Sequence, residues 1–132
     1  MTFEAIVPGL KGEVRLVVAE EHTAQHLGSG AAKVLATPQM VLLMERAGVA
    51  AVDHLLPEGY RTVGARLDVR HQAPTPIGFE ARASAELMEV QGRRLIFRVE
   101  VHDEVELVGE GTHERAIINV HRFSERVAQK AR

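Results

Sequence analysis

The segment from Thr37 to Leu56 constrains the fold of this sequence more than any other. Hydrocarbon and thioether side chains cover most of its circumference when it is drawn as a helix, which is typical of a helix surrounded by other structure. Thr37 is expected to be the N-cap with Pro38 at the first helical position, and Pro57 with Gly59 ends the pattern. The sequence therefore predicts one long, buried helix.

A carboxylate, Glu45, interrupts this apolar helix. Its neighbours three, four and seven residues away supply no cation; they are Pro38, Val41, Leu42, Gly48, Val49 and Val52. An unpaired carboxylate is costly to bury unless it becomes protonated, so Glu45 is predicted to be a site residue. Gly48 is unfavourable in mid-helix and is expected to mark the close approach of another backbone.

After the helix the apolar period changes to two, which predicts a strand from residue 61. The face of this strand toward the core is predicted to carry Val63, Ala65, Leu67, Val69 and His71. The opposite face is predicted to carry Thr62, Gly64, Arg66, Asp68 and Arg70. Further strands are expected over 13–19, 79–90, 94–103 and 107–120, with a loop over 20–33 and a short helix over 123–130.

One strand, one apolar helix and four more strands predict an α+β fold in which an antiparallel sheet curls around a central helix. The 132 residues fit a single domain over 1–132. Sheet edges in such a small protein are usually covered by dimerisation.

Composition excludes several classes of function. Sixteen Lys and Arg against eighteen Asp and Glu, with a single Tyr and no basic run, argue against a nucleic-acid partner. The absence of cysteine excludes disulfides, thiolate catalysis and Cys-ligated zinc. Neither a signal-peptide pattern nor an apolar run of about 20 residues occurs, so we expect a cytoplasmic protein that does not enter a membrane.

Three polar groups are expected to converge: Thr37 at the helix N-terminus, Glu45 two turns on, and His71 at the end of the inward strand face. A helix N-terminus can stabilise an oxyanion. Glu45 could attack a carbonyl or deprotonate water, and His71 could transfer protons. Each group also has a structural interpretation, Thr37 as a cap and His71 as a hydrogen-bonded strand residue.

The residues around these groups resemble the fluoroacetyl-CoA thioesterase-like family of the hotdog superfamily. The resemblance is carried by ATPQMVLLMERAGV, TVGARLDVRHQAPTPIG, EVQGRRLIFRVEVHD and VGEGTHERAII. It aligns the catalytic Thr, Glu and His of the family with Thr37, Glu45 and His71. It also places the family's glycine near the acyl group at Gly64, and its arginine near the acyl or CoA portion at Arg115.

This resemblance implies a hotdog fold and hydrolysis of short acyl-CoA thioesters without a metal or other cofactor. It further implies a homodimer, or a dimer of dimers, with sites at the subunit interface. Thr37 would support the carboxylate or the carbonyl, Glu45 would be nucleophile or general base, and His71 would protonate the leaving thiolate. The family's Phe-bearing lid has no counterpart in 27–36, which implies a broader range of short acyl groups.

Two other functions fit the same fold. The first is a non-catalytic protein that binds acyl-CoA as a sensor or carrier, although a sensor does not need a carboxylate inside an apolar helix. The second is an acyl-CoA hydratase, which would usually pair Asp with His at the opening of the helix, and this pair is absent.

Histidines and arginines elsewhere are weaker candidates. His22 and His26 have the spacing of two metal ligands, but no third ligand lies nearby. Surface positions are expected for His102, His113 and His121, with His113 close enough to Arg115 to reach the mouth of the site. Two arginine pairs are interpreted either as solvated faces or as contacts for CoA phosphates; they are Arg93 with Arg94, and Arg122 with Arg126.

Overall fold

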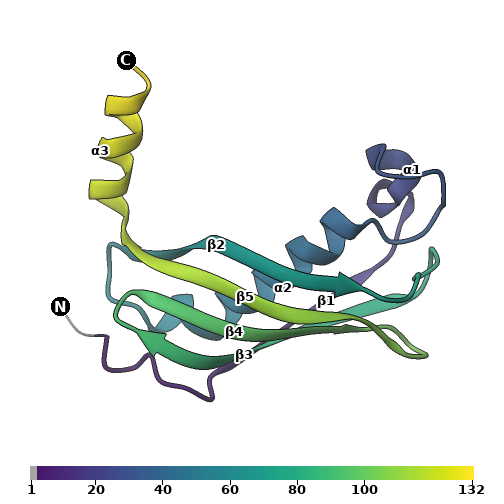
Figure 1. Ribbon diagram of the computed structural model, residues 1–132, viewed down its shortest axis with the longest axis horizontal. Helices are drawn as coiled ribbons and strands as arrows, with labels where there is room; N and C mark the ends of the chain where they lie inside the picture. Colours follow the sequence, from purple (N-terminus) through teal and green to yellow (C-terminus); the bar gives the residue numbers. More distant parts are fainter. Residues whose placement is uncertain (1–2) are drawn as a thin grey trace.

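The computed structural model describes residues 3–132. The helices and strands follow the chain in this order: β1 (Lys11–Val17), a 3-10 turn (Glu20–His22), α1 (Ala24–Leu27), α2 (Thr37–Val52), a second 3-10 turn (Asp53–Leu55), β2 (Tyr60–His71), β3 (Glu80–Gln91), β4 (Arg94–His102), β5 (Leu107–Asn119) and α3 (Val120–Lys130). The five strands form one antiparallel sheet that runs along helix α2 (Figure 1). The predicted α+β class is confirmed.

Three boundaries differ from the sequence predictions. Helix α2 ends at Val52 rather than near residue 56, because the chain tightens into the 3-10 turn before Pro57. The predicted loop over 20–33 contains a 3-10 turn and the one-turn helix α1, whose N-cap Thr23 accepts a hydrogen bond from the His26 amide. Helix α3 begins at Val120, three residues earlier than predicted, because the Asn119 side chain caps it.

The strands lie in the order β1-β3-β4-β5-β2, so β1 and β2 are the two edges of the sheet. One face of the sheet packs on α2, and the core between them includes Met40, Leu43, Met44, Leu87, Leu95, Phe97 and Val99. Gly12 of β1 lets the two backbones meet, because a Cβ at this position would overlap the backbone at Ala47 and Ala51. One face of α2 is therefore buried, as predicted. The helix is not surrounded on all sides within this chain, because Val49 and Ala50 on its other face are exposed.

A β-bulge in β2 changes which residues face the helix. Gly64 pairs with Arg115 and Arg66 pairs with Glu114, which leaves Ala65 unpaired. Bulges of this kind bend a strand and interrupt its alternation. Thr62 is therefore buried, whereas Ala65 is exposed. Val63 pairs with Ala116, which alternates with the buried Arg115 and Ile117 and so lies on the other face of the sheet. The predicted inward positions at Val63 and Ala65 are therefore wrong.

After the bulge the inward positions at Leu67, Val69 and His71 agree with the prediction, because all three are partly buried between exposed neighbours. Before the bulge the even-numbered residues of β2 face helix α2, and after the bulge the odd-numbered residues do. Thr62 and Gly64, expected on the opposite face, come to face the helix instead.

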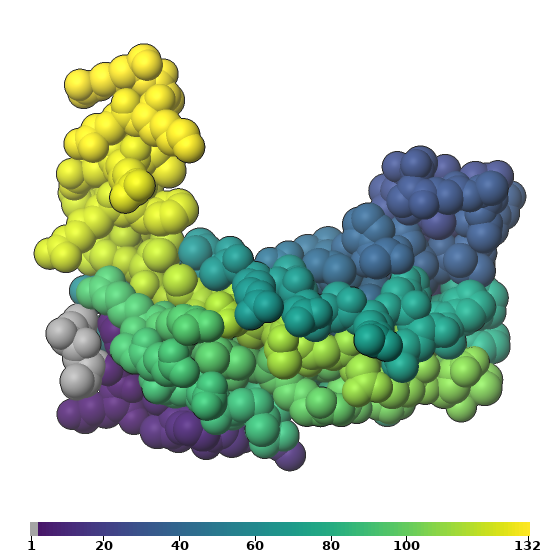
Figure 2. All heavy atoms as spheres, viewed as in Figure 1, coloured from purple at the N-terminus to yellow at the C-terminus, as the bar shows by residue number. Residues whose placement is uncertain are grey.

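Two projections give the molecule a concave side. Helix α3 stands away from one end of the sheet, and the region of α1 rises at the other end (Figure 1). Figure 2 shows the hollow between them, with β2 along its floor. None of the helices described for residues 3–132 combines the length and the apolar character needed to cross a bilayer.

Candidate active site

Thr37 and His71 form a direct pair where the start of α2 meets the end of β2. The hydroxyl Oγ1 of Thr37 lies 2.7 Å from Nδ1 of His71. The N-cap of α2 is Ala36, and Thr37 is the first helical residue, with its hydroxyl making no capping bond. The predicted capping role of Thr37 is therefore wrong, because its hydroxyl is bonded to the histidine.

The pair lines an open pocket of about 270 Å³. Its remaining walls are mostly small or aliphatic and include Ala24, Val34 and Ala73, with Ser29 and Gln72 as polar members. Because the pocket sits at the first turn of α2, the helix contributes the partial positive charge of its N-terminus to this wall. The pocket therefore combines a hydroxyl, an imidazole and an electropositive helix end.

His71 is neutral near pH 7 in this setting. Burial lowers its pKa below the ordinary value of 6.5, and the backbone of Ala73 offsets only part of that effect. Its Nε2 atom is buried and has no hydrogen-bond partner among residues 3–132. A neutral imidazole with one ring nitrogen on a hydroxyl can take up or deliver a proton there.

Glu45 belongs to a second cluster. The prediction that its carboxylate is buried without a cationic partner is wrong. The side chain is 34% exposed rather than buried, and its Oε1 lies 3.7 Å from Nη1 of Arg115. This cation comes from β5, so the pattern of the helix alone did not reveal it. Gly64 faces the same carboxylate, because a Cβ at this position would overlap Oε1 of Glu45. The bulge at Ala65 is what turns Gly64 toward the helix.

Arg115 is buried at 5% exposure, and polar groups surround it. Its Nε donates to the hydroxyl of Thr62 at 2.8 Å, and its Nη2 donates to the Thr62 carbonyl at 3.1 Å. Thr62 in turn donates its hydroxyl to Asp53 at 2.5 Å. Burial lowers the pKa of Arg115, while the charges of Asp53 and Glu45 act in the opposite direction. The guanidinium that faces Glu45 is thus rigidly oriented.

His113 completes this network from inside the core and is fully buried. The expectation of a surface position is wrong, because His113 lies on the inward face of β5 two residues from Arg115. Its Nε2 accepts a hydrogen bond from Nη1 of Arg115 at 3.1 Å, since a guanidinium can only donate. Its Nδ1 therefore carries the proton and donates to the carbonyl of Arg66 at 2.8 Å.

Gly48 makes room for this network on the helix. A Cβ there would lie 3.1 Å from Cδ of Arg115 and 3.5 Å from Cδ2 of His113. The prediction that Gly48 marks the close approach of another backbone is wrong, because the side chains of Arg115 and His113 occupy this space.

Sequence reasoning missed Asp53, Thr62 and the inward role of His113. A signal for His113 was available, since residues two apart on a strand share a face and Arg115 was already a candidate. No such signal existed for Thr62, because the bulge decided its face.

The two clusters do not meet within one chain. Thr37 and Glu45 are separated by about two helical turns, or roughly 12 Å along the axis. No hydrogen bond or ion pair among residues 3–132 joins Glu45 to Thr37 or His71. The structure thus pairs Thr37 with His71, and Glu45 with Gly64 and Arg115.

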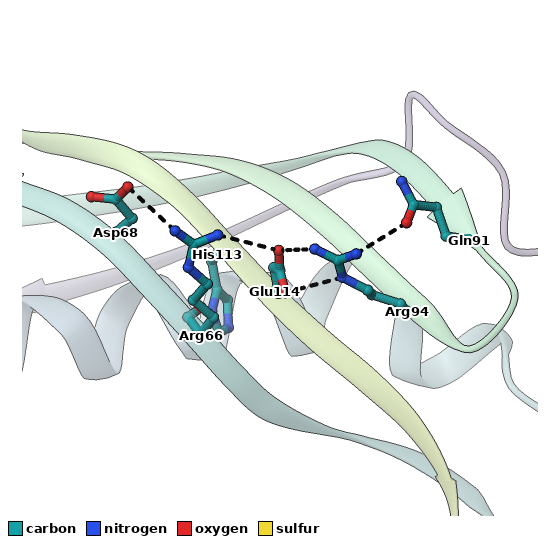
Figure 3. A network of polar contacts seen from close by, with 6 residues as sticks. All are labelled: Arg66, Asp68, Gln91, Arg94, His113 and Glu114. Atoms are coloured by element: carbon teal, nitrogen blue, oxygen red, sulfur yellow. Dashed lines mark hydrogen bonds and ion pairs between the residues drawn. The ribbon is translucent and has the colours of Figure 1, made fainter.

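Some of the remaining candidate histidines and arginines are hydrogen-bonded or ion-paired to other residues of the protein. Nδ1 of His22 accepts a hydrogen bond from the Ala19 amide at 2.9 Å. Arg94 is paired with Glu114 on the outer face of the sheet, where Glu114 lies between Arg66 and Arg94 (Figure 3). No group of three residues suited to hold a metal ion occurs within 3–132.

Comparison with known proteins gives consistent findings. The profile of the family described as fluoroacetyl-CoA-specific thioesterase, FlK, matches residues 18–121. The fluoroacetyl-CoA thioesterase of Streptantibioticus cattleyicolor is 46% identical over 98 residues, which cover 74% of this chain and 70% of that protein. A threonine-to-serine mutant of FlK, solved in complex with acetyl-CoA, is 38% identical with a TM-score of 0.89, covering 96% of this chain and 100% of that one.

A hot-dog-like protein from Thermanaerovibrio acidaminovorans shares the fold at 24% identity, with a TM-score of 0.89 over 98% of this chain and 97% of that chain. The hotdog architecture implied by the resemblance is therefore confirmed.

Proposed function

This chain belongs to the fluoroacetyl-CoA-specific thioesterase family, and from this premise we propose that it hydrolyses short-chain acyl-CoA thioesters to free acid and CoA. The proposed site consists of Thr37, Glu45 and His71, assisted by Gly64 and Arg115. It uses no metal and no other cofactor. Its parts are the pocket at the start of α2 and the carboxylate cluster in the middle of that helix.

The bond between Thr37 and His71 is the observation that carries this proposal. A hydroxyl 2.7 Å from an imidazole of lowered pKa has the geometry of a group activated or oriented by a neighbouring base. Nδ1 of His71 contacts the Thr37 hydroxyl, and both residues line the pocket, so the imidazole can pass a proton through that hydroxyl to the departing thiolate. The N-terminus of α2 favours the oxyanion that forms when the thioester carbonyl is attacked.

Glu45 supplies the carboxylate for attack, either directly on the carbonyl or through a water molecule. Its partial exposure leaves it accessible to substrate, and Arg115 orients it from the core side. Gly64 leaves space beside the carboxylate that any side chain would fill. An acyl group could approach Glu45 through this space.

A homodimer offers a way to bring the two clusters together. Strand β2 is a sheet edge with unpaired backbone groups, and it forms the floor of the hollow in Figure 2. Antiparallel pairing of two β2 strands would turn the second chain end for end. The partner's carboxylate cluster would then approach the Thr37 and His71 pair, giving sites shared between subunits, in a dimer or a dimer of dimers.

The first experiment measures thiol release from acetyl- to hexanoyl-CoA. Glu45→Gln is expected to lower turnover by about a hundredfold or more, the scale of a general base. The variant should stay folded, because Arg115 keeps its bonds to Thr62 and His113. Glu58→Gln removes an exposed carboxylate and serves as the matched control. Tight binding of acyl-CoA with no hydrolysis of any ester would support a sensor or carrier instead.

The second experiment tests the shared site. Chains carrying Thr37→Ala and chains carrying Glu45→Gln are co-expressed with different tags, and the mixed dimer is purified. A site shared between subunits leaves one intact site in this dimer, so activity returns although each parent is inactive. An inactive mixed dimer would show that each chain supplies its own complete site.

A further inference from the structure

Resting on the proposed function, we propose that a groove at the base of α3, lined by Arg93, Arg122 and Arg126, binds the phosphate groups of the CoA portion of the substrate. The groove measures about 230 Å³ and lies between the end of β5 and α3. Arg93 comes from the turn between β3 and β4, whereas Arg122 and Arg126 are one helical turn apart on α3. Two separate parts of the chain thus bring arginine residues to one groove.

The charge of this groove is not neutralised by the protein. Among the described residues, no carboxylate belongs to its lining, whose other members are Ile117, Ile118, Asn119 and Phe123. Within residues 3–132, none of its three arginines lies within 4.0 Å of an acidic side chain, unlike Arg94 and Arg98 on the sheet. Like charges that share a small space repel one another, so a bound anion would be stabilised there.

Neighbouring contacts hold the groove in shape. The guanidinium carbon of Arg93 lies 5.9 Å from the ring centroid of Phe3 and 5.8 Å from that of Tyr60, within the range of a cation–π contact. The Asn119 side chain accepts a hydrogen bond from the Arg122 amide at 3.0 Å. The Val120 amide donates to the Gly59 carbonyl at 2.9 Å, which ties the start of α3 to the chain before β2.

Glu125, the acidic residue of α3, is engaged elsewhere. Its Oε1 lies 2.6 Å from Nε2 of His121. It therefore leaves Arg122 and Arg126 free to bind an anion.

The chemistry of the groove matches the ADP portion of CoA. Guanidinium groups bind phosphate oxygens through paired hydrogen bonds, and CoA carries a diphosphate and a 3′-phosphate close together. Phe123 is 42% exposed and lines the same groove, so it offers the adenine ring an apolar surface.

The position of the groove also suits the substrate. Asn119 lies four residues beyond Arg115 on β5, about 14 Å along an extended strand. The pantetheine arm separates the thioester from the phosphates by a distance of this order. One CoA molecule could therefore reach from the groove to the Glu45 cluster.

The exposed apolar residues of α3 raise one alternative occupant. Val120, Phe123 and Val127 form a stripe beside basic residues, a pattern also found in helices that lie on anionic membranes. Arg93 argues for a compact phosphate ligand, because it faces the groove from outside the helix. A helix that lies on a flat lipid surface binds through its own face, so a cation on the β3–β4 turn would not contribute to that binding.

Calorimetric titration with adenosine 3′,5′-bisphosphate tests the proposal without requiring turnover. Wild-type protein is expected to bind this probe and not adenosine, and the double variant R122Q/R126Q should bind it at least tenfold more weakly. Arg82→Gln removes one exposed guanidinium from β3, away from the groove, and should bind normally. Equal binding by wild type and the double variant, or binding to anionic vesicles but not to the bisphosphate, would overturn the proposal.

Kinetics separate this inference from the proposed function. For R122Q/R126Q, KM should rise at least tenfold for acetyl-CoA and stay unchanged for acetyl-pantetheine, which lacks the phosphates, with kcat preserved for both. Hydrolysis with an unchanged KM for acetyl-CoA would refute the groove and leave the thioesterase proposal standing. Binding of the bisphosphate by a protein that hydrolyses no ester would support the groove and refute the thioesterase proposal.

Discussion

The hydroxyl of Thr37 lies 2.7 Å from Nδ1 of His71, joining the first residue of α2 to the last residue of β2 across 34 positions of sequence. A threonine at this place in a helix would normally be interpreted as a cap. The contact with His71 instead gives the hydroxyl a role in the pocket, and this difference can be measured.

Replacing Thr37 separates catalysis from helix capping. Thr37→Ala is expected to lower kcat/KM by about a hundredfold or more, whereas Thr37→Ser keeps the hydroxyl and should retain more activity. Because the hydroxyl does not cap α2, Thr37→Ala should cost less than the roughly 1 kcal/mol typical of a lost cap.

Thr23→Ala is the matched control for stability, because Thr23 is fully buried and its hydroxyl caps α1. Urea denaturation of both variants checks this expectation. A larger loss of stability for Thr37→Ala than for Thr23→Ala would restore the capping interpretation.

Gly64→Ala tests whether the space beside Glu45 matters. The new methyl group would overlap Oε1 of Glu45 and displace the carboxylate, and a displacement of about 1 Å in a site can lower the rate by roughly a hundredfold. The fold should survive, because the partly exposed carboxylate can move into solvent.

Gly30→Ala gives the comparison for stability, since its methyl group would meet only Cβ of Ala24 at 3.6 Å. Thiol release and urea denaturation of both variants provide the data. Near-native turnover of Gly64→Ala would exclude a role for this space.

Stability should depend on pH through His71 and His113. Burial lowers the pKa of both below the ordinary 6.5, so the unfolded chain binds protons more readily than the folded one. The contribution of these histidines to the free energy of unfolding is therefore expected to be constant above pH 6.5. It should decrease as the pH falls below 6.5, where the unfolded chain binds more protons.

Urea denaturation between pH 5 and 8 measures this dependence. His113→Gln should reduce this dependence, because an amide cannot titrate, and the remainder should come from His71. An unchanged slope in that variant would show that His113 does not carry the effect.

The acyl range follows from the walls of the pocket. Over the described part of the chain, none of its lining residues is Phe, Tyr or Trp, and Ala24, Ser29 and Val34 come from α1 and the segment after it. A pocket distinguishes small acyl groups by only about 1 to 3 kcal/mol. The ratio of kcat/KM for fluoroacetyl-CoA over acetyl-CoA should therefore follow the ratio for alkaline hydrolysis of the two esters, and longer chains should be accepted. An enzymatic preference larger by several orders of magnitude would place the selectivity elsewhere in the pocket.

Local pattern determined much of the fold. The apolar circumference of α2 and the period-two strands after it depend on neighbours within a few residues, so the sequence predicted the central helix, the strands and the antiparallel class. The polar residues Thr37, Glu45 and His71 also stood out, because each interrupts or ends an apolar pattern.

Tertiary structure decided how these residues are paired. The bulge at Ala65 reversed the parity of half of β2, and with it the faces of Thr62 and Gly64. Arg115 on β5 reaches Glu45 on α2, so a carboxylate that seemed unpaired in the sequence belongs to an ion pair. The pattern of a single helix or strand carries no information about a partner on another element. The contacts of Thr37 with His71 and of Glu45 with Arg115 exist only once the sheet has packed against the helix.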